Sequence, residues 1–297
     1  MRPTEGSKKL CPLLILSQKT PKHITMEKQT VIAGFQHVDN SQYQILIQFL
    51  ENVASHPVVK EGLEQQMKSM DLKTGDQVLD VGCGVGIQAQ EIAKRVGATG
   101  KVVGTDISNV MIEVAKSKIS NSDLPIEFFV AEASSQPFPD QSFDSIRTER
   151  VLMYITDIQK VLQEFKRLLK PGGKLVIFEF HWDGTLISHE DKELTRRITH
   201  YLTDSFPNNR IGADLYYELK SNGFKNVNAK PYTYYGSDEI ILDIVKKTYI
   251  PVLQQGISKG IFTEVEINNW WKSLDKGVET GKFFMSFPGL IGYGTKD

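Results

Sequence analysis

The sequence contains little cysteine, almost no net charge and no long apolar run. Only two of its 297 residues are cysteine, Cys11 and Cys83, which is too few for a fold held together by disulfides. Neither has the partners of a metal site, so no metal is expected. This cysteine usage favours a reducing compartment, and we expect a cytoplasmic protein.

Charge and hydropathy exclude further classes of protein. The 35 Lys and Arg residues nearly balance the 36 Asp and Glu residues, which leaves a formal net charge of −1. Electrostatics therefore gives no general reason to expect nucleic acid or an anionic membrane as a partner. No apolar run approaches the roughly 18–20 residues that cross a bilayer.

The first 30 residues carry the weakest signals. A short apolar run at residues 10–16 follows Lys8 and Lys9, but it lacks the length and the cleavage site of a secretory signal. We expect residues 1–30 to be a disordered tail, with a targeting role as the alternative. Residues 31–297 are long enough for one large domain.

A glycine turn after an apolar strand is the strongest motif in the chain. Residues 77–81 are predicted to form a buried strand, and a helix is predicted at residues 87–96. The turn between them contains Gly82, Gly84 and Gly86. A second strand at residues 101–105 ends on an acidic residue, Asp106. Strand, glycine turn, helix and acid-capped strand together indicate a nucleotide-binding βαβ unit.

Downstream of this unit, predicted strands continue to alternate with predicted helices. Further strands are expected at residues 126–131, 142–148 and 174–180, with helices at residues 110–118 and 158–169. This alternation predicts an α/β fold with a mostly parallel sheet and helices on both faces.

Two predicted helices, at residues 32–53 and 58–70, precede the first strand. They either pack on the edge of the sheet or cover the ligand as a flap, because an open α/β sheet binds at the carboxyl ends of its strands. We assign residues 31–70 to this helical flap. In the second interpretation Tyr43 faces the substrate.

The rest of the single domain is divided by its periodicity. Residues 71–180 are expected to form the cofactor-binding core, and residues 181–297 a segment on the substrate side. Two last strands are expected at residues 226–233 and 282–293. A helical insert at residues 237–281 separates them.

Asp80 lies one residue before the end of the first strand. A carboxylate there can accept a hydrogen bond from a cationic amine or orient the amides of the turn. A pyrophosphate on the helix N-terminus would be disfavoured by this adjacent negative charge. The turn also lacks the Gly-x-Gly-x-x-Gly spacing of dinucleotide sites.

Residues after the second and third strands can hold an adenosine. Asp106 can accept hydrogen bonds from both ribose hydroxyls, or it can cap the following helix. Ile107 and Met111 either enclose the base or belong to the core. Glu132 can accept a hydrogen bond from an adenine amino group, while Ala133 leaves room for the ring.

Four motifs in order resemble those of class I S-adenosylmethionine-dependent methyltransferases. They are the strand and turn at residues 78–86, the acid at Asp106, Pro-Phe-Pro-Asp-Gln-Ser-Phe-Asp at residues 137–144 and Leu-Lys-Pro-Gly-Gly-Lys at residues 169–174. The resemblance covers residues 77–180. It extends to the C-terminus, where residues 281–284 and Gly292 look like the family's reversed final strand.

The resemblance implies a Rossmann-like sheet of seven strands in the order 3-2-1-4-5-7-6, with the seventh antiparallel. It implies S-adenosylmethionine as the cofactor, with Arg150 among the residues that bind it, and methyl transfer to a small, partly apolar molecule. The subgroup it looks most similar to contains the methyltransferases of quinone and polyketide biosynthesis. The methylated atom, O, N or C, is left open.

The chain departs from the family's pattern at two positions. Glu132 stands where such proteins often have Asp, which implies a shifted adenine. Tyr154 stands where many have His, so no histidine can act from there. The Asp/Asn-Pro-Pro-Tyr/Phe motif of many nucleic-acid methyltransferases is absent, which argues against a nucleic-acid substrate.

Candidate catalytic residues follow the fifth strand. His181 and Asp183 are candidate general bases, and His181 has a suitable unperturbed pKa; the alternative is that His181 only packs or hydrogen-bonds within its loop. Trp182 either forms a wall of the acceptor pocket or belongs to the core. Tyr201 and Arg210 are expected near the substrate, although Arg210 can equally be a surface residue.

Two other functions remain open at this point. A nicotinamide-dependent oxidoreductase would share the βαβ unit, but Asp80 and the spacing of the turn argue against it. A protein that binds S-adenosylmethionine without methyl transfer, or for other chemistry, would show the same motifs.

Overall fold

The computed structural model describes residues 43–297. The predictions for residues 1–30 and for the start of the flap lie outside this range. No helix in residues 43–297 combines the length and the apolar character that a membrane span requires. Within the same residues no three His, Cys, Asp or Glu side chains gather as metal ligands would.

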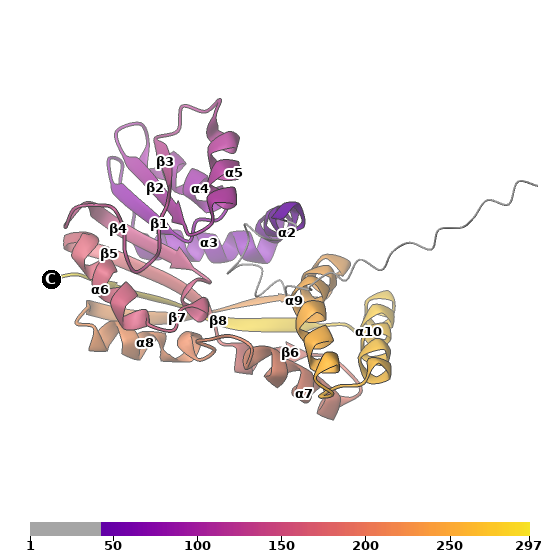
Figure 1. Ribbon diagram of the computed structural model, residues 1–297. Helices are drawn as coiled ribbons and strands as arrows, with labels where there is room; N and C mark the ends of the chain where they lie inside the picture. Colours follow the sequence, from indigo (N-terminus) through magenta and orange to yellow (C-terminus); the bar gives the residue numbers. More distant parts are fainter. Residues whose placement is uncertain (1–42) are drawn as a thin grey trace, which may run out of the picture.

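One mixed sheet organises the described chain (Figure 1). Its strand order is β3-β2-β1-β4-β5-β8-β6, and β7 pairs with β8 outside this path. The first five strands pair in parallel, whereas β8 runs antiparallel to β5, β6 and β7. The strands are β1 (Gln77–Val81), β2 (Lys101–Asp106), β3 (Ile126–Val130), β4 (Phe143–Glu149), β5 (Leu169–Phe180), β6 (Leu186–Ile187), β7 (Lys225–Gly236) and β8 (Met285–Thr295).

The predicted fold class and strand order are confirmed. The expected sixth and seventh strands are β7 and β8 of the structure, and β8 is the reversed strand. The strand count differs because of β6, a strand of two residues that pairs with Met285 and Ser286 at the start of β8. It raises the strand count from seven to eight.

The helices lie before, between and after these strands. They are α2 (Tyr43–Ser55), α3 (Pro57–Met70), α4 (Ile87–Val96), α5 (Asn109–Ile119), α6 (Ile158–Leu168), α7 (Lys192–Thr203), α8 (Ile211–Ser221), α9 (Glu239–Ser258) and α10 (Glu264–Glu279), with short 3-10 turns at Leu152–Tyr154 and Trp182–Gly184. The helices α9 and α10 fall within the insert expected at residues 237–281.

Two of these helices cover opposite faces of the reversed end of the sheet. Gly62 of α3 packs on Tyr232 and Tyr234, where an added Cβ would lie 2.8 Å from both rings. Gly292 of β8 packs on Leu215 of α8, and a Cβ added to Gly292 would lie 2.7 Å from the Leu215 side chain. Tyr234 pairs with Phe287 of β8, and their side chains lie on the same face of the sheet. Because successive residues of a strand face opposite sides, Phe287 and Gly292 lie on opposite faces, and so do the two contacts.

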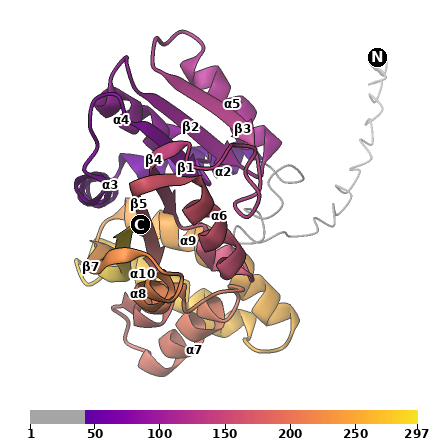
Figure 2. The same ribbon diagram turned by 90° about the vertical axis from the view of Figure 1, so that its left-hand side faces the viewer.

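The two views show a second group of helices beyond the sheet (Figures 1 and 2). The helices α7, α9 and α10 gather at one end of the β7–β8 pair, away from β1, β2 and β3. The long strands β7 and β8 therefore connect the parallel sheet with this helical cap.

Local sequence explains where α6 begins and ends. The Asp157 side chain accepts a hydrogen bond from the Lys160 N–H at 3.2 Å and caps the first turn. The apolar face of the helix is fully buried; it consists of Val161, Leu162, Phe165 and Leu168. The helix ends at Leu168, one residue before the predicted end at residue 169. The Lys-Pro-Gly-Gly segment that follows lies within β5, whose first residue pairs with Phe143.

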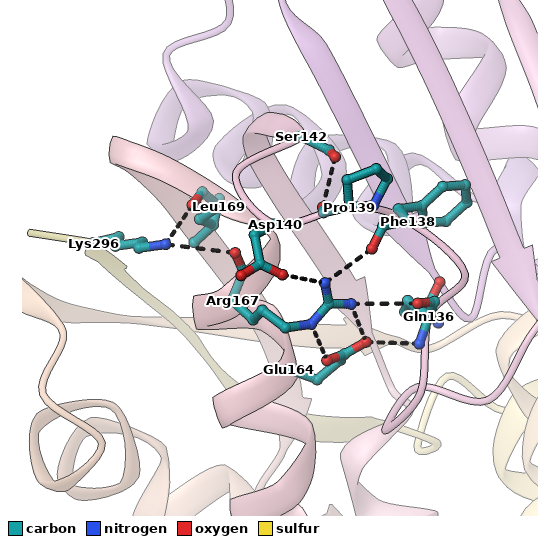
Figure 3. A network of polar contacts seen from close by, with 9 residues as sticks. All are labelled: Gln136, Phe138, Pro139, Asp140, Ser142, Glu164, Arg167, Leu169 and Lys296. Carbon is teal, nitrogen blue, oxygen red and sulfur yellow. Dashed lines mark hydrogen bonds and ion pairs between the residues drawn. The ribbon is translucent and has the colours of Figure 1, made fainter.

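Arg167, near the end of α6, ties this helix to the loop before β4 (Figure 3). Its guanidinium donates to Glu164 through Nε and Nη2, both at 2.8 Å. It also donates to the Phe138 carbonyl oxygen at 2.9 Å and to Asp140 Oδ1 at 2.7 Å. The fixed fork of one arginine thus holds a proline-rich loop that has no regular structure of its own.

Candidate functional site

A cavity of about 610 Å³ lies at the carboxyl ends of the parallel strands. One half is lined by the glycine turn and by the residues that follow β2 and β3. The other half is lined by α3, α9 and the aromatic residues of β5, β7 and β8, and α2 borders both halves. Ligand pockets in proteins typically span roughly 300–1,000 Å³, so one cavity of this size can serve two adjacent ligands.

The glycine turn presents its backbone to the first half. Gly82 and Gly84 line the cavity and have positive φ angles of 72° and 53°. A Cβ on Gly82 would lie 2.2 Å from Cγ2 of Val151. Glycine is therefore required both by the backbone conformation and by the close approach of the residues after β4.

Gly86 has a different role from its two neighbours. It lies outside the lining of the cavity and forms the N-cap position of α4, with φ 75°. A Cβ there would lie 2.5 Å from the ring of Phe128. Its small size therefore serves the packing between α4 and β3.

Asp106 lines the cavity and also organises the turn. Its Oδ2 accepts a hydrogen bond from the Gly84 N–H at 2.9 Å, and its Oδ1 accepts one from the Ser108 N–H at 2.9 Å. Ser108, not Asp106, caps α5 through its hydroxyl. A carboxylate accepts hydrogen bonds through both oxygens, so the position of Asp106 on the lining of the cavity suits the predicted ribose.

The four residues expected around the adenine all line the same half. The side chain of Ile107 is exposed, whereas Met111 is buried. Glu132 and Ala133 come from the loop after β3. The backbone carbonyl of Glu132 accepts a hydrogen bond from the Gln136 amide nitrogen at 2.8 Å, which fixes this loop.

Asp80 does not line the cavity and is 1% exposed. Its Oδ1 forms an ion pair with Nη1 of Arg147 at 2.8 Å. Its Oδ2 is buried and has no hydrogen-bond partner in residues 43–297. Burial raises the pKa of Asp80, although the guanidinium of Arg147 opposes this shift.

A chain of buried charges continues from Arg147 toward the aromatic half. Arg147 also pairs with Glu149, whose other carboxylate oxygen accepts from the Tyr234 hydroxyl at 3.3 Å and pairs with Nε of Arg150 at 3.2 Å. Although burial acts to raise the pKa of Glu149, Arg150 and Arg147 hold it below the usual value. The two acids and two arginines from Asp80 to Arg150 balance in charge.

Sequence reasoning included Arg150 but missed Arg147, Glu149 and Tyr234, all of which line the cavity. One signal could have found the first of these. A charged residue in a central parallel strand must be paired, because unpaired burial of a charge is costly. The sequence of β4 places Arg147 in such a strand.

The second half of the cavity is apolar and largely aromatic. Trp182 lines this half and is also buried in the core, so it has the position of both predicted alternatives. Its ring stacks on Phe206 with centroids 4.7 Å apart. Phe180 and Phe287 pack around this pair. Ile244 of α9 closes another side. An apolar lining of this kind favours an apolar ligand.

The predicted catalytic and remaining substrate residues are not brought to the cavity. Asp183 is exposed, and His181 lies beside Gly184 with a buried Nδ1 that has no hydrogen-bond partner among the described residues. Tyr201 packs edge-on against Phe262, and Arg210 is exposed and pairs with Asp214. Their placement gives no support to a base or substrate role.

Tyr43 is the first residue of α2, but its side chain lies outside the described part of the structure. The helix itself does cover the cavity. Phe49 and Leu50 of α2 contribute to the lining, and Leu46 packs with Val85 and Met111. The flap interpretation of this segment agrees with that geometry.

The family model described as "Methyltransferase domain" matches residues 72–230. An uncharacterised 37.1 kDa protein from transposon TN4556 of Streptomyces fradiae is 30% identical over 78% of this chain and 67% of its own length. The ubiquinone/menaquinone biosynthesis C-methyltransferase UbiE of Francisella philomiragia is 38% identical over 52% of this chain. That match spans 61% of the UbiE protein, so about two fifths of this relative has no counterpart in the match.

Solved structures share the fold at low sequence identity. The YcgJ protein of Bacillus subtilis superposes with a TM-score of 0.57 at 19% identity, over 80% of this chain and 98% of that one. Phosphoethanolamine N-methyltransferase 2 of Haemonchus contortus, solved with S-adenosyl-L-methionine, gives the same TM-score at 19% identity, over 88% of this chain and 59% of that one. The [4+2]-cyclase SpnF gives 0.54 at 19% identity, over 90% of this chain and 96% of that one.

Proposed function

The chain belongs to the class I S-adenosylmethionine-dependent methyltransferases, and on this premise we propose that it methylates a small, partly apolar molecule. One observation carries the proposal. A single cavity joins a polar half, built on the glycine turn and Asp106, to an apolar half behind it. The first half suits an adenosyl cofactor, and the second suits a small acceptor.

The residues of the polar half fit S-adenosylmethionine. Asp106 would hold the ribose, Ile107 and Met111 would flank the adenine, and Glu132 with Ala133 would meet its edge. All five line the same half of the cavity. A purine needs apolar faces and a polar edge, and a ribose needs an acceptor for its hydroxyls, which is the arrangement present.

The amino-acid end of the cofactor would lie near the glycine turn. The guanidinium of Arg150, on the lining, is a candidate donor to its carboxylate. Asp80 lies behind the lining and is buried, so its carboxylate would act on the amine through its charge and not by direct contact. Gly82 and Gly84 would let the ligand approach the backbone. When bound, the cofactor supplies a methyl group already activated on a sulfonium.

The chain's own contribution to the transfer is alignment and the exclusion of water. The apolar half holds the acceptor against the boundary formed by Glu149, Arg150 and Tyr234. Holding two reactants in line can supply much of a rate enhancement. Because His181 and Asp183 lie outside the lining, we assign no general base to them.

The partner and the location follow from the sequence. We propose a small-molecule acceptor and not a nucleic acid, because the net charge is −1 and the charge pattern has no basic excess. We also propose a cytoplasmic location, since the low cysteine content favours a reducing compartment.

The proposal is tested by calorimetry with S-adenosylmethionine, S-adenosylhomocysteine and NAD in separate titrations. We expect both adenosyl ligands to bind and NAD not to bind. Asp106→Ala should weaken both by at least tenfold, while Asp123→Ala, an exposed aspartate outside the cavity, should leave them unchanged. Binding of NAD alone would refute the proposal.

Catalysis is tested with methyl-labelled cofactor and a small-molecule extract. We expect label to appear in an apolar, low-molecular-weight product. Tight cofactor binding without any labelled product would instead favour a protein that uses the cofactor for other chemistry.

A further inference from the structure

Glu179 is a carboxyl group in the interior of the sheet that the proposed reaction does not use. It is the penultimate residue of β5 and is fully shielded from solvent. Its neighbours in the strand, Phe178 and Phe180, are both apolar and buried. Burying a carboxyl group is costly unless specific contacts compensate, so its contacts must explain its position.

Those contacts go to the turn that follows β4. Oε1 of Glu179 accepts hydrogen bonds from the backbone N–H groups of Val151 at 2.8 Å and Leu152 at 2.6 Å. The N–H of Arg150 donates to the Phe178 carbonyl oxygen at 2.9 Å. Three consecutive amides of the turn are therefore bound to β5.

The turn has a conformation that needs such support. Arg150 has a φ of 56°, in the left-handed region that side chains other than glycine disfavour. Such residues are strained and persist only where their surroundings hold them. Two amides that converge on one carboxyl oxygen supply this restraint.

The turn also carries residues of the cofactor half. Arg150 and Val151 line the cavity. The Val151 side chain would lie 2.2 Å from a Cβ on Gly82. The turn at residues 150–152 is therefore in direct contact with the glycine turn. A shift of the turn at residues 150–152 would therefore move both the Arg150 guanidinium and the Val151 side chain that packs against Gly82.

We propose that Glu179 is a positioning residue for the cofactor, acting through the turn at residues 150–152. It does not touch the ligand; it fixes Arg150 and Val151 in the conformation that completes the binding site. This inference rests on the proposed adenosyl ligand. It goes beyond that proposal by assigning the geometry of the site to a group outside the cavity lining.

The test is the affinity for S-adenosylhomocysteine, measured by calorimetry at pH 7.5. Glu179→Leu removes the acceptor at nearly the same volume and should weaken binding at least tenfold. Glu179→Gln keeps an acceptor oxygen and should stay within about threefold of the wild type. If Glu179→Leu does not fold, Glu179→Asp decides, since its shorter side chain withdraws the oxygen and should weaken binding at least threefold.

A double-mutant cycle separates positioning from general stability. If Glu179 acts through Arg150, then Glu179→Leu in an Arg150→Ala background should weaken binding by less than threefold. Glu266→Leu is the matched control, because Glu266 also accepts a backbone N–H, from Thr263, but in a cap helix outside the cavity. It should leave the affinity unchanged.

The outcomes are distinct. If the folded Glu179 variants bind as the wild type does, or if the losses from Glu179 and Arg150 are additive, the positioning role is refuted. If the wild type itself binds neither S-adenosylhomocysteine nor S-adenosylmethionine, the proposed function fails, and this inference fails with it.

Discussion

Asp80 and Arg147 lie directly opposite each other on the paired strands β1 and β4 and form a buried ion pair of 2.8 Å. The exposed fractions of the two side chains are 1% and 3%. Arg147 also forms an ion pair with Glu149. One guanidinium therefore bridges two carboxylates, Asp80 near the end of β1 and Glu149 at the boundary of the apolar half, and Arg150 supplies the second positive charge to Glu149.

Arg147→Met should lower the free energy of unfolding by about 3–5 kcal/mol, because it leaves buried carboxylates without their partner. The measurement is urea unfolding at pH 7. Arg95→Met is the control, since Arg95 forms a solvent-exposed pair with Glu64 and such pairs contribute about 0–1 kcal/mol. Similar losses for the two variants would contradict the importance of the buried pair.

Gly82→Ala should weaken S-adenosylhomocysteine binding by at least tenfold and destabilise the fold. Both effects follow from the positive φ and from the 2.2 Å approach to Val151. Gly172→Ala is a matched comparison, because Gly172 has φ 75° but open space around a Cβ. Gly172→Ala should lower the free energy of unfolding only by the cost of the left-handed conformation, about 1–2 kcal/mol. Its affinity for S-adenosylhomocysteine in calorimetry should be unchanged.

Ile244→Trp should fill part of the apolar half while leaving the cofactor half intact. We expect the affinity for S-adenosylhomocysteine to stay within about twofold and the transfer of labelled methyl groups to fall at least tenfold. Ile240→Trp, one turn earlier in α9, changes an exposed residue outside the cavity and should affect neither quantity. Equal effects of the two substitutions would place the acceptor elsewhere.

The pH dependence of stability should report on Glu179. Burial raises its pKa to about 8, against the opposing effects of its two amide donors and of Arg150, whereas an unfolded glutamate titrates near 4.3. Between about pH 4.5 and 8 the folded state holds a proton that the unfolded state has lost, so stability falls as pH rises. Glu149 and Tyr154 are the other titratable groups facing this site.

Urea unfolding of the wild type and of Glu179→Gln at pH 5, 6, 7 and 8 measures this effect. The wild type should lose more free energy of unfolding across the series than the variant, which has no group to titrate there. Parallel curves would contradict a raised pKa.

Much of the cofactor half was predictable because it depends on short-range signals. The glycine turn directly follows β1, and Asp106 is the last residue of β2. Because β1 and β2 pair in parallel, both lie at the same edge of the sheet. The same logic placed Ile107, Met111, Glu132 and Ala133 on the cavity. Gly86 was assigned to the ligand because the sequence does not reveal that Phe128 lies behind it.

The apolar half was less predictable because it depends on long-range packing. Proximity in sequence suggested His181 and Asp183, since they follow β5 directly. The chain turns there, Trp182 enters the cavity and its neighbours do not. Tyr234 and Phe287 reach the site from the β7–β8 pair, and no local pattern distinguishes them from ordinary core residues.

The insertion of α9 and α10 between two antiparallel neighbours has an evolutionary consequence. Strands β7 and β8 pair along most of their length, so the segment joining them can change in length and sequence without altering the order of the parallel strands. Ile241 and Ile244 of this segment line the apolar half. Acceptor preference can thus diverge among descendants of such a chain while the cofactor machinery is inherited intact.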